Sequence, residues 1–328
     1  MTVSDRVHRE TETAPGAAPA GPLGVPPSRH PRGDASAPVG SLPLAGRAVR
    51  RRPTLWALAR RSPLGAGAAL FLLALLAVAV VGPIVGRSDP LATSPLAMFA
   101  PPGPGLPLGG DYLGRDVLAR LVEVLRVSFA LAAASALLAA TIGILLGLIA
   151  GYAGGGPDEA VMRLTDLLFA FPTLLLALLI AMVTGPGIPG VLVTIVVATI
   201  PVFARVARGP TLSVRATEYA LAARVAGAAP PRIILRHVLP NITSPLLVQL
   251  AFTLSGALVA ESGLSFLGLG VQPPMPSLGS LLRDGRTYME LAPWMMLVPG
   301  LTLAATILAI NLLGDELQGL LDPRLRRR

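Results

Sequence analysis

Charged side chains at helical spacing are concentrated in one stretch between two long apolar runs, residues 218–241, which reads EYALAARVAGAAPPRIILRHVLPN. The stretch carries one glutamate, three arginines and one histidine. Side chains of these types form ion pairs and hydrogen bonds with another surface, but they offer neither a nucleophile with its base nor a set of metal ligands. The stretch therefore predicts binding to another molecule rather than catalysis of a reaction.

The rest of the sequence excludes most kinds of catalysis. All 27 basic residues are arginine, so the lysine of a Walker A phosphate loop and the lysine of a Schiff base are both missing. There is no cysteine, and the three histidines, His8, His30 and His237, share no ligand spacing. We therefore expect no enzyme activity, no metal and no cofactor in this chain. The net charge of +9 is explained better by arginines flanking membrane spans than by nucleic-acid binding.

Local signals in the stretch predict a short helix, a tight turn and a second short helix. The small side chains of Ala222 and Ala223 allow close approach of another surface to the first helix. Gly227 suits the left-handed residue after a helix end, and Pro231 suits the first turn of the next helix. We expect that second helix to end at Leu239-Pro240-Asn241. On composition alone, an interfacial helix whose arginines contact anionic lipid is a competing interpretation.

The elements that hold this stretch are membrane spans. Of the 328 residues, 53% are hydrophobic and 14% charged, with a mean hydropathy of +0.67, and several apolar runs reach the length that crosses a bilayer as a helix. We predict an all-α integral membrane protein with six spans, some of which contain the prolines Pro172, Pro201 and Pro299. The predicted spans are residues 64–85, 127–150, 167–183, 188–206, 245–263 and 293–314.

These spans divide the chain into predicted regions. Residues 1–53 are rich in Pro, Gly and Arg and are expected to be disordered and cytoplasmic. Residues 54–126 hold the first span and an extracytoplasmic loop, whose later part, LGRDVLARLVEVLRVS, is expected to lie along the membrane surface. Residues 127–316 form the core with the charged loop 209–244, and residues 317–328 form a cytoplasmic tail.

The arginines predict the orientation of the spans. With both termini in the cytoplasm, 21 arginines fall in cytoplasmic segments and 6 in external ones. The opposite orientation would violate the positive-inside rule. The sequence therefore predicts N-in and C-in, with the charged loop in the cytoplasm.

Glu261 is the ionisable residue of greatest interest within the apolar runs. It follows the segment GALVA near the predicted outer end of the fifth span. An ionisable group there is a functional candidate, in a translocation path or at a subunit interface. Hydration at the membrane surface is the alternative. Asp166, at the inner end of the third span, is interpreted as an interfacial charge.

The charged loop also resembles a known family. Glu218, Ala222, Ala223, Gly227, Leu239 and Pro240 match in order and spacing the EAA loop of ABC importer permeases. Residues 113–121, 151–172, 261–282 and 311–326 resemble the dipeptide/oligopeptide branch, in particular its "C" type permease subunit. The resemblance covers about residues 55–326. The family often reads Gly-Thr-Asp where this chain has Gly110 before Asp111.

The resemblance implies a type I ABC importer permease in the plasma membrane of a bacterium, a multi-pass subunit that forms half of a translocation path. Its implied partners are a second, non-identical permease, two P-loop ATPase subunits that bind ATP, an extracytoplasmic binding protein and membrane lipid, with no nucleic acid. The loop, including Arg224, would dock into the ATPase. The implied cargo is di- and oligopeptides; nickel complexes, glutathione or another small solute are alternatives. An ion-coupled secondary transporter is the rival class, although no evident inverted repeat supports it.

Overall fold

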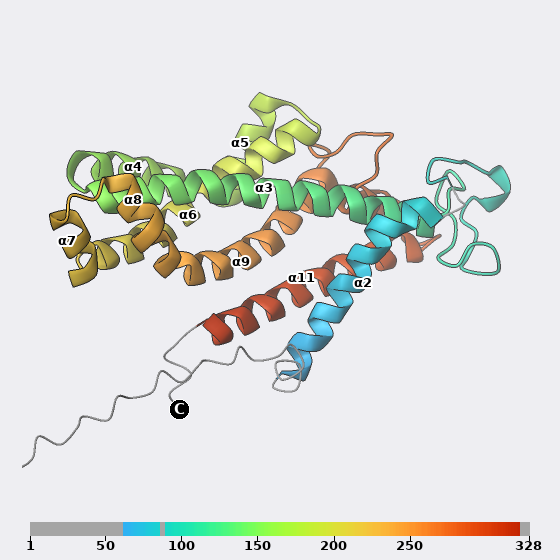
Figure 1. Ribbon diagram of the computed structural model, residues 1–328. Coiled ribbons are helices and arrows are strands. Elements are labelled where there is room, and N and C mark those ends of the chain that lie inside the picture. The colour runs from blue at the N-terminus through green and yellow to red at the C-terminus, as the bar shows by residue number, and fades with distance from the viewer. Residues whose placement is uncertain (1–61, 86–88, 322–328) are drawn as a thin grey trace, which may run out of the picture. The chain divides into compact units, whose positions relative to one another are not determined.

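The computed structural model describes residues 62–85 and 89–321, so the predictions for residues 1–53 and for most of the tail lie outside the described residues. Helices joined by loops make up this part of the chain (Figure 1). They are α2 (Pro63–Val85), η1 (Pro95–Ala97), α3 (Val117–Ala153), α4 (Gly155–Phe169), α5 (Thr173–Thr184), α6 (Ile188–Arg215), α7 (Glu218–Val225), α8 (Pro230–Ile233), η2 (Ile234–Val238), α9 (Leu239–Phe266), α10 (Leu278–Thr287) and α11 (Trp294–Leu321).

Among the described residues, five helices are long and apolar enough to cross a membrane: α2, α3, α6, the continuous helix Pro230–Phe266 and α11. The third predicted span, residues 167–183, is not one helix. It is divided at Ala170–Pro172 between the end of α4 and the 12-residue helix α5. The residue before a proline disfavours helical geometry, which explains the break at Phe171. The six-span count therefore stays a prediction.

Helix α3 begins ten residues earlier than its predicted span. Asp116 caps it by accepting a hydrogen bond from the Leu118 N–H, and the helix then runs for 37 residues. At 1.5 Å per residue this is about 55 Å, well beyond a hydrocarbon core of about 30 Å. Residues 117–126 are therefore continuous with the predicted span, because no residue there breaks the helix, and their place along the membrane surface stays a prediction.

Three glycines on one side of α3 allow its backbone to lie directly against α6. A Cβ atom on Gly143 would lie 2.6 Å from the Ile200 carbonyl oxygen, and one on Gly147 would lie 2.3 Å from the Ala204 carbonyl oxygen. Gly151 repeats the pattern one turn later, against Thr211. Small residues at every fourth position are common where membrane helices pack. In a bilayer, van der Waals contact between closely spaced helices stabilises the packing, because the hydrophobic effect does not.

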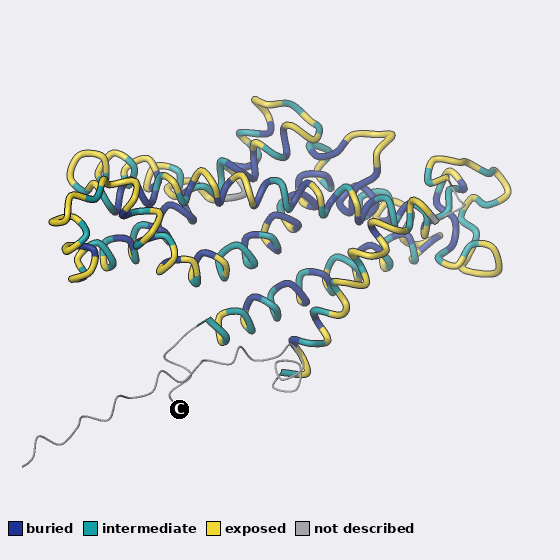
Figure 2. The backbone as a smooth tube through the Cα atoms, in the orientation of Figure 1, coloured by how far each residue is buried: buried dark blue, intermediate teal, exposed yellow. Residues whose placement is uncertain are grey.

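The core lies where α3, α6, α9 and α11 meet, and Figure 2 shows buried residues along these helices and exposed ones over most of α2. Helix α10 packs among α3, α9 and α11. The loop of residues 89–116 and helix α7 lie at opposite ends of α3 (Figure 1). These two ends are called the α10 end and the α7 end below, since α10 lies toward the first.

Candidate functional site

The turn predicted after the first short helix of the charged loop is present. Helix α7 begins at Glu218 and ends at Val225, and Gly227 follows with φ +80°. The Ala228 N–H bonds to the Ala223 carbonyl, and the Gly227 N–H bonds to the Arg224 carbonyl. This is the Schellman arrangement, which needs a left-handed residue where Gly227 stands. The glycine therefore sets the direction in which the chain leaves α7.

The second short helix starts as expected but does not end as expected. Pro230 and Pro231 open α8, yet the helix continues through Leu239-Pro240-Asn241 into α9. The π-helical turn η2 comes first, and in it the Leu239 N–H bonds to the Ile234 carbonyl, five residues back. A wider turn suits Pro240, which has no N–H to donate and crowds the carbonyl four residues back in an α-helix. The prediction of a helix end at Pro240 is wrong.

One side of this segment is fixed to the bundle. Ile233, Val238 and Ile242 are buried against Leu148 of α3 and Ala207 of α6. Ala223 and Leu239 pack partly against the same cluster. The segment from α7 to the start of α9 is therefore packed against the ends of α3 and α6.

The other side of the segment is exposed. Glu218, Ala222, Arg224, Gly227 and Pro240 are open to the surroundings. Val225 is 89% exposed, and further apolar side chains are exposed beside it, namely Tyr219, Leu221 and Leu235. Exposed apolar side chains gathered among charged ones are typical of a protein interaction site. We call this surface the α7 surface, and it consists of Glu218, Tyr219, Leu221, Ala222, Arg224, Val225, Gly227 and Leu235.

Two arginines, one at the end of α6 and one in α7, contact the end of α3. Arg215 at the end of α6 donates hydrogen bonds to the carbonyls of Gly151 and Tyr152, at 2.9 and 3.0 Å. The Arg224 guanidinium lies 5.4 Å from the centre of the Tyr152 ring, within cation–π range. Arg232 and Arg236 are exposed, and no ion pair of either is found in the described part of the chain.

Helix α4 is held to α6 by ion pairs at the same end. Arg208 bonds to Asp158 through two nitrogens, one of them at 2.7 Å, and Arg205 bonds to Asp166. Asp166, interpreted as an interfacial charge, is thus paired. The hydrogen bonds from Arg208 lower the pKa of Asp158 below its ordinary value. The α7 end is a connected unit of α3, α4, α6 and α7.

Glu261 is fully buried within this chain, with 0% exposure, which argues against hydration at the surface. Its carboxylate accepts hydrogen bonds from Ser128 of α3 at 3.0 Å and from Ser265 at 2.8 Å, with Ser262 at 3.4 Å. Ser128 also accepts a hydrogen bond from the Leu278 N–H, at the start of α10. The carboxylate therefore joins α3, α9 and α10, near the positive end of the α10 dipole. Its predicted place in a path or at a subunit interface stays a prediction.

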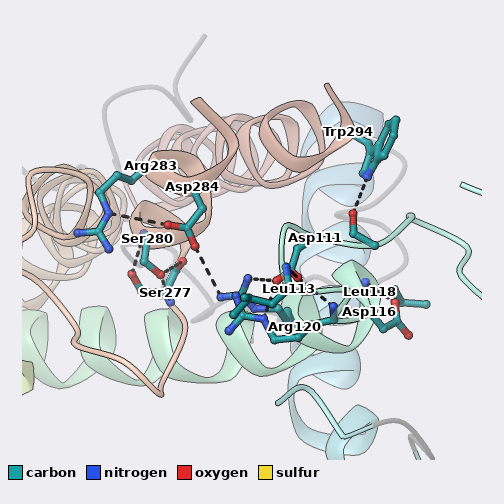
Figure 3. A network of polar contacts seen from close by, with 12 residues as sticks. Asp111, Leu113, Asp116, Leu118, Arg120, Ser277, Ser280, Arg283, Asp284 and Trp294 are labelled. Atoms are coloured by element: carbon teal, nitrogen blue, oxygen red, sulfur yellow. Dashed lines mark hydrogen bonds and ion pairs between the residues drawn. The ribbon is translucent and has the colours of Figure 1, made fainter. Parts of the chain in front are cut away.

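A second buried polar network lies at the α10 end (Figure 3). Asp111 is 1% exposed and accepts hydrogen bonds from the side chains of Arg115 and Arg120, both at 2.6 Å, and from the Leu113 and Arg115 N–H groups. Arg120 also lies 3.9 Å from Asp284 of α10. Trp294 donates to the Gly110 carbonyl on the same loop. The loop is thereby attached to α3, α10 and α11.

The sequence reasoning did not single out this network. Arg120 lies in a segment that was interpreted as a surface segment and as part of the resemblance, with Asp111 just before it, and Asp284 lies far along the chain in α10. The signal was a run of opposite charges, Asp111, Arg115 and Arg120, at spacings of four and five residues. Burial raises the pKa of Asp284, while the nearby Arg120 opposes that shift.

Comparisons with known proteins agree with this arrangement. Residues 143–327 match a family described as the binding-protein-dependent transport system inner membrane component. The chain is 38% identical over 266 residues to the di/tripeptide transport system permease protein DppC of Pseudomonas aeruginosa, covering 79% of this chain and 88% of that protein. It is 42% identical over 219 residues to the glutathione transport system permease protein GsiD of Pectobacterium atrosepticum, covering 67% and 73%.

A solved structure supports the fold. An inward-facing structure of the MetNI methionine ABC transporter aligns with a TM-score of 0.50 and 19% identity, over 60% of this chain and 93% of that one. This similarity concerns the helical arrangement.

Proposed function

The chain belongs to the family of binding-protein-dependent transport system inner membrane components, and we propose that it carries di- and oligopeptides as one of two non-identical permease subunits. It is an ABC importer permease, a multi-pass protein of the bacterial plasma membrane. Such a permease is a transport component that works with an ATPase and a binding protein. The finer proposal adds a second permease subunit and two P-loop ATPase subunits.

The α7 surface is the proposed contact with the ATPase. The observation that carries this proposal is the pairing of an exposed side with a fixed one: Val225 is 89% exposed, whereas Ile233 is buried among α3 and α6 side chains. A surface that only bound lipid would need no rigid base. Glu218 and Arg224 lie on the exposed side, where they add charged contacts to an apolar patch.

Movement of the docked ATPase would be transmitted to the membrane helices both through the continuous chain and through side-chain contacts. Helix α7 follows α6 after two residues, and α8 is continuous with α9. The Arg215 hydrogen bonds to Gly151 and Tyr152 join the same unit to α3. A displacement of α7 therefore acts on three long helices at once, which is what coupling ATP hydrolysis to a change of access requires.

A cavity of about 260 Å³ among α5, α6, α9 and the end of α4 is the proposed contribution to the path. Its lining is mostly apolar, with the hydroxyls of Thr194, Thr199 and Thr253 and no charged side chain. Hydroxyls can donate to or accept from a peptide backbone without a strong preference for side-chain charge. This suits cargo that varies in side chain, selected mainly by the binding protein.

Peptide cargo is supported by the similarity to the Pseudomonas aeruginosa relative, which is named as a di/tripeptide transport permease. The relative named for glutathione favours that tripeptide as the second candidate. The test is uptake by the complex reconstituted in liposomes with its binding protein. ATP-dependent accumulation of a labelled dipeptide supports the proposal, whereas accumulation of glutathione with no dipeptide uptake selects the second candidate.

We also propose six spans with both termini in the cytoplasm, with the residues from Leu167 to Thr184 crossing as a broken third span. Helix α5 has 12 residues, about 18 Å, and needs the end of α4 to complete a crossing. The chain has no cysteine, so single cysteines report topology directly. A cysteine at Gly185 should react with an impermeant thiol reagent from outside intact cells, and one at Gly155 should not. Reaction of both from the same side would overturn this topology.

A further inference from the structure

A crevice between α2 and the rest of the bundle forms a largely apolar cavity of about 420 Å³. Three alanines, Ala79, Ala130 and Ala133, keep it open, because their side chains are too small to fill it. Its larger lining residues are Leu72, Leu76, Phe129, Leu254, Leu258 and Ile310. The cavity is therefore bounded by α2, α3, α9 and α11.

The crossing of α2 and α3 produces this crevice. At Gly82 the two helices are in close contact, since a Cβ atom there would lie 2.4 Å from a methyl carbon of Val122. Away from this point the helices diverge, and α2 runs toward α11 (Figure 1). The cavity is thus a wedge that begins about one helical turn from the crossing.

One positively charged side chain, that of Arg126, lines the cavity. Arg126 lies four residues after Val122 on α3 and is exposed. In the described part of the chain it has no ion pair, not even with Glu123 one turn earlier. It immediately precedes the apolar stretch of residues 127–150. A charge at that boundary lies at the depth of lipid headgroups, to which a long arginine side chain can extend.

We propose that this crevice binds one anionic phospholipid, with an acyl chain in the cavity and its phosphate on Arg126. Guanidinium binds phosphate through paired, charge-assisted hydrogen bonds, and the apolar walls suit a hydrocarbon chain. A helix of a partner subunit fits less well. A helix is about 10 Å across with a pitch of 5.4 Å, so the volume holds little more than one turn. The site is independent of the cargo and of the ATPase contact.

The test measures phospholipid bound to the importer complex purified in mild detergent. Phosphatidylglycerol is titrated and bound lipid is counted by native mass spectrometry, with phosphatidylcholine, which is zwitterionic and has no net charge, as the comparison. Arg126→Gln should weaken phosphatidylglycerol binding about tenfold, the effect of losing a charge-assisted contact. Arg126→Lys should keep most of it. Ala133→Phe should displace the lipid by filling the cavity, whatever the headgroup.

Matched variants make the result decisive. Arg163→Gln removes an exposed arginine of α4 that lies away from the cavity, and Leu137→Phe enlarges an exposed α3 side chain that does not line it. Both should bind phosphatidylglycerol as the wild type does. Unchanged binding in Arg126→Gln and Ala133→Phe would overturn the proposal. So would loss of the second permease from Ala133→Phe with lipid binding intact, because the crevice would then be a subunit interface.

Discussion

The hydroxyl of Ser128 on α3 donates a hydrogen bond of 3.0 Å to the carboxylate of Glu261 on α9, and both residues are fully buried. The same hydroxyl accepts from the backbone at the start of α10. One serine thus links three helices around a carboxylate that forms no ion pair in the described part of the chain. A buried carboxylate of this kind depends on its hydrogen-bond donors.

Ser128→Ala should therefore lower the free energy of unfolding by about 1–3 kcal/mol, because it leaves a buried acceptor with one donor fewer. The matched control is Ser135→Ala on the same helix, whose buried hydroxyl has no hydrogen-bond partner in the described part of the chain. That change should cost little. Thermal unfolding of the purified chain measures both, and equal losses would contradict the role given to Ser128.

The α3–α6 contact predicts that alanine substitution lowers protein stability at one glycine but not at another. Gly147→Ala places a Cβ atom 2.3 Å from the Ala204 carbonyl oxygen. Overpacking of this kind costs about 1–3 kcal/mol. Gly209→Ala in α6 meets nothing within 4 Å, so the better helix propensity of alanine should leave stability equal or higher. The melting temperatures of the two variants should move in opposite directions, or only that of Gly147→Ala should fall.

Among residues at the α10 end, substitution of Asp111 should cause the largest loss of stability. Asp111→Asn removes the negative charge shared by Arg115 and Arg120, and breaking a buried ion pair costs about 3–5 kcal/mol. Asp116→Asn changes the same residue type nearby, but asparagine caps a helix as well as aspartate does. The control should unfold like the wild type. If Asp111→Asn did too, the network would not hold the loop in place.

The Asp158–Arg208 pair predicts a pH dependence. Since the folded-state pKa of Asp158 is lowered, the pair stabilises the protein above the ordinary aspartate value of 3.8, and this contribution is lost as the pH falls through the lowered pKa. Asp158→Asn should therefore be less stable than the wild type near pH 7, and the difference should shrink as the pH falls below 3.8 and disappear below the lowered pKa. The pair is partly exposed, so salt should reduce the effect. A difference that persisted at low pH would point to another cause.

The features that sequence predicted are those with local signals. Gly227 and the two prolines after it fix the end of α7 and the start of α8 because each restricts its own backbone angles. Apolar length likewise predicted five long apolar helices and the membrane location, whereas the third predicted span, residues 167–183, is divided between α4 and α5. The continuous helix through Pro240 was not predicted because a π-helical turn upstream accommodates the proline. No signal in the local sequence predicts that turn.

The features that sequence could not predict depend on distant pairing. The burial of Glu261 rests on Ser128, 133 residues away, and the Asp158–Arg208 pair spans 50 residues. The sequence does not identify the partner of a buried or paired carboxylate, because any of several serines or arginines could form the hydrogen bond or ion pair. The resemblance to importer permeases named the α7 surface, but not the network around Asp111, which becomes visible only when α10 lies beside α3.

The contact between the α7 surface and the ATPase is tested most directly by cross-linking. Because the chain has no cysteine, Val225→Cys gives a single thiol at an exposed position of α7. With a short thiol-to-amine cross-linker in native membranes, we expect a product that contains the ATPase subunit, and none from Leu301→Cys, an exposed position on α11. The contrary result is an intact complex in which Val225→Cys gives no ATPase product, or one no more abundant than the product from Leu301→Cys.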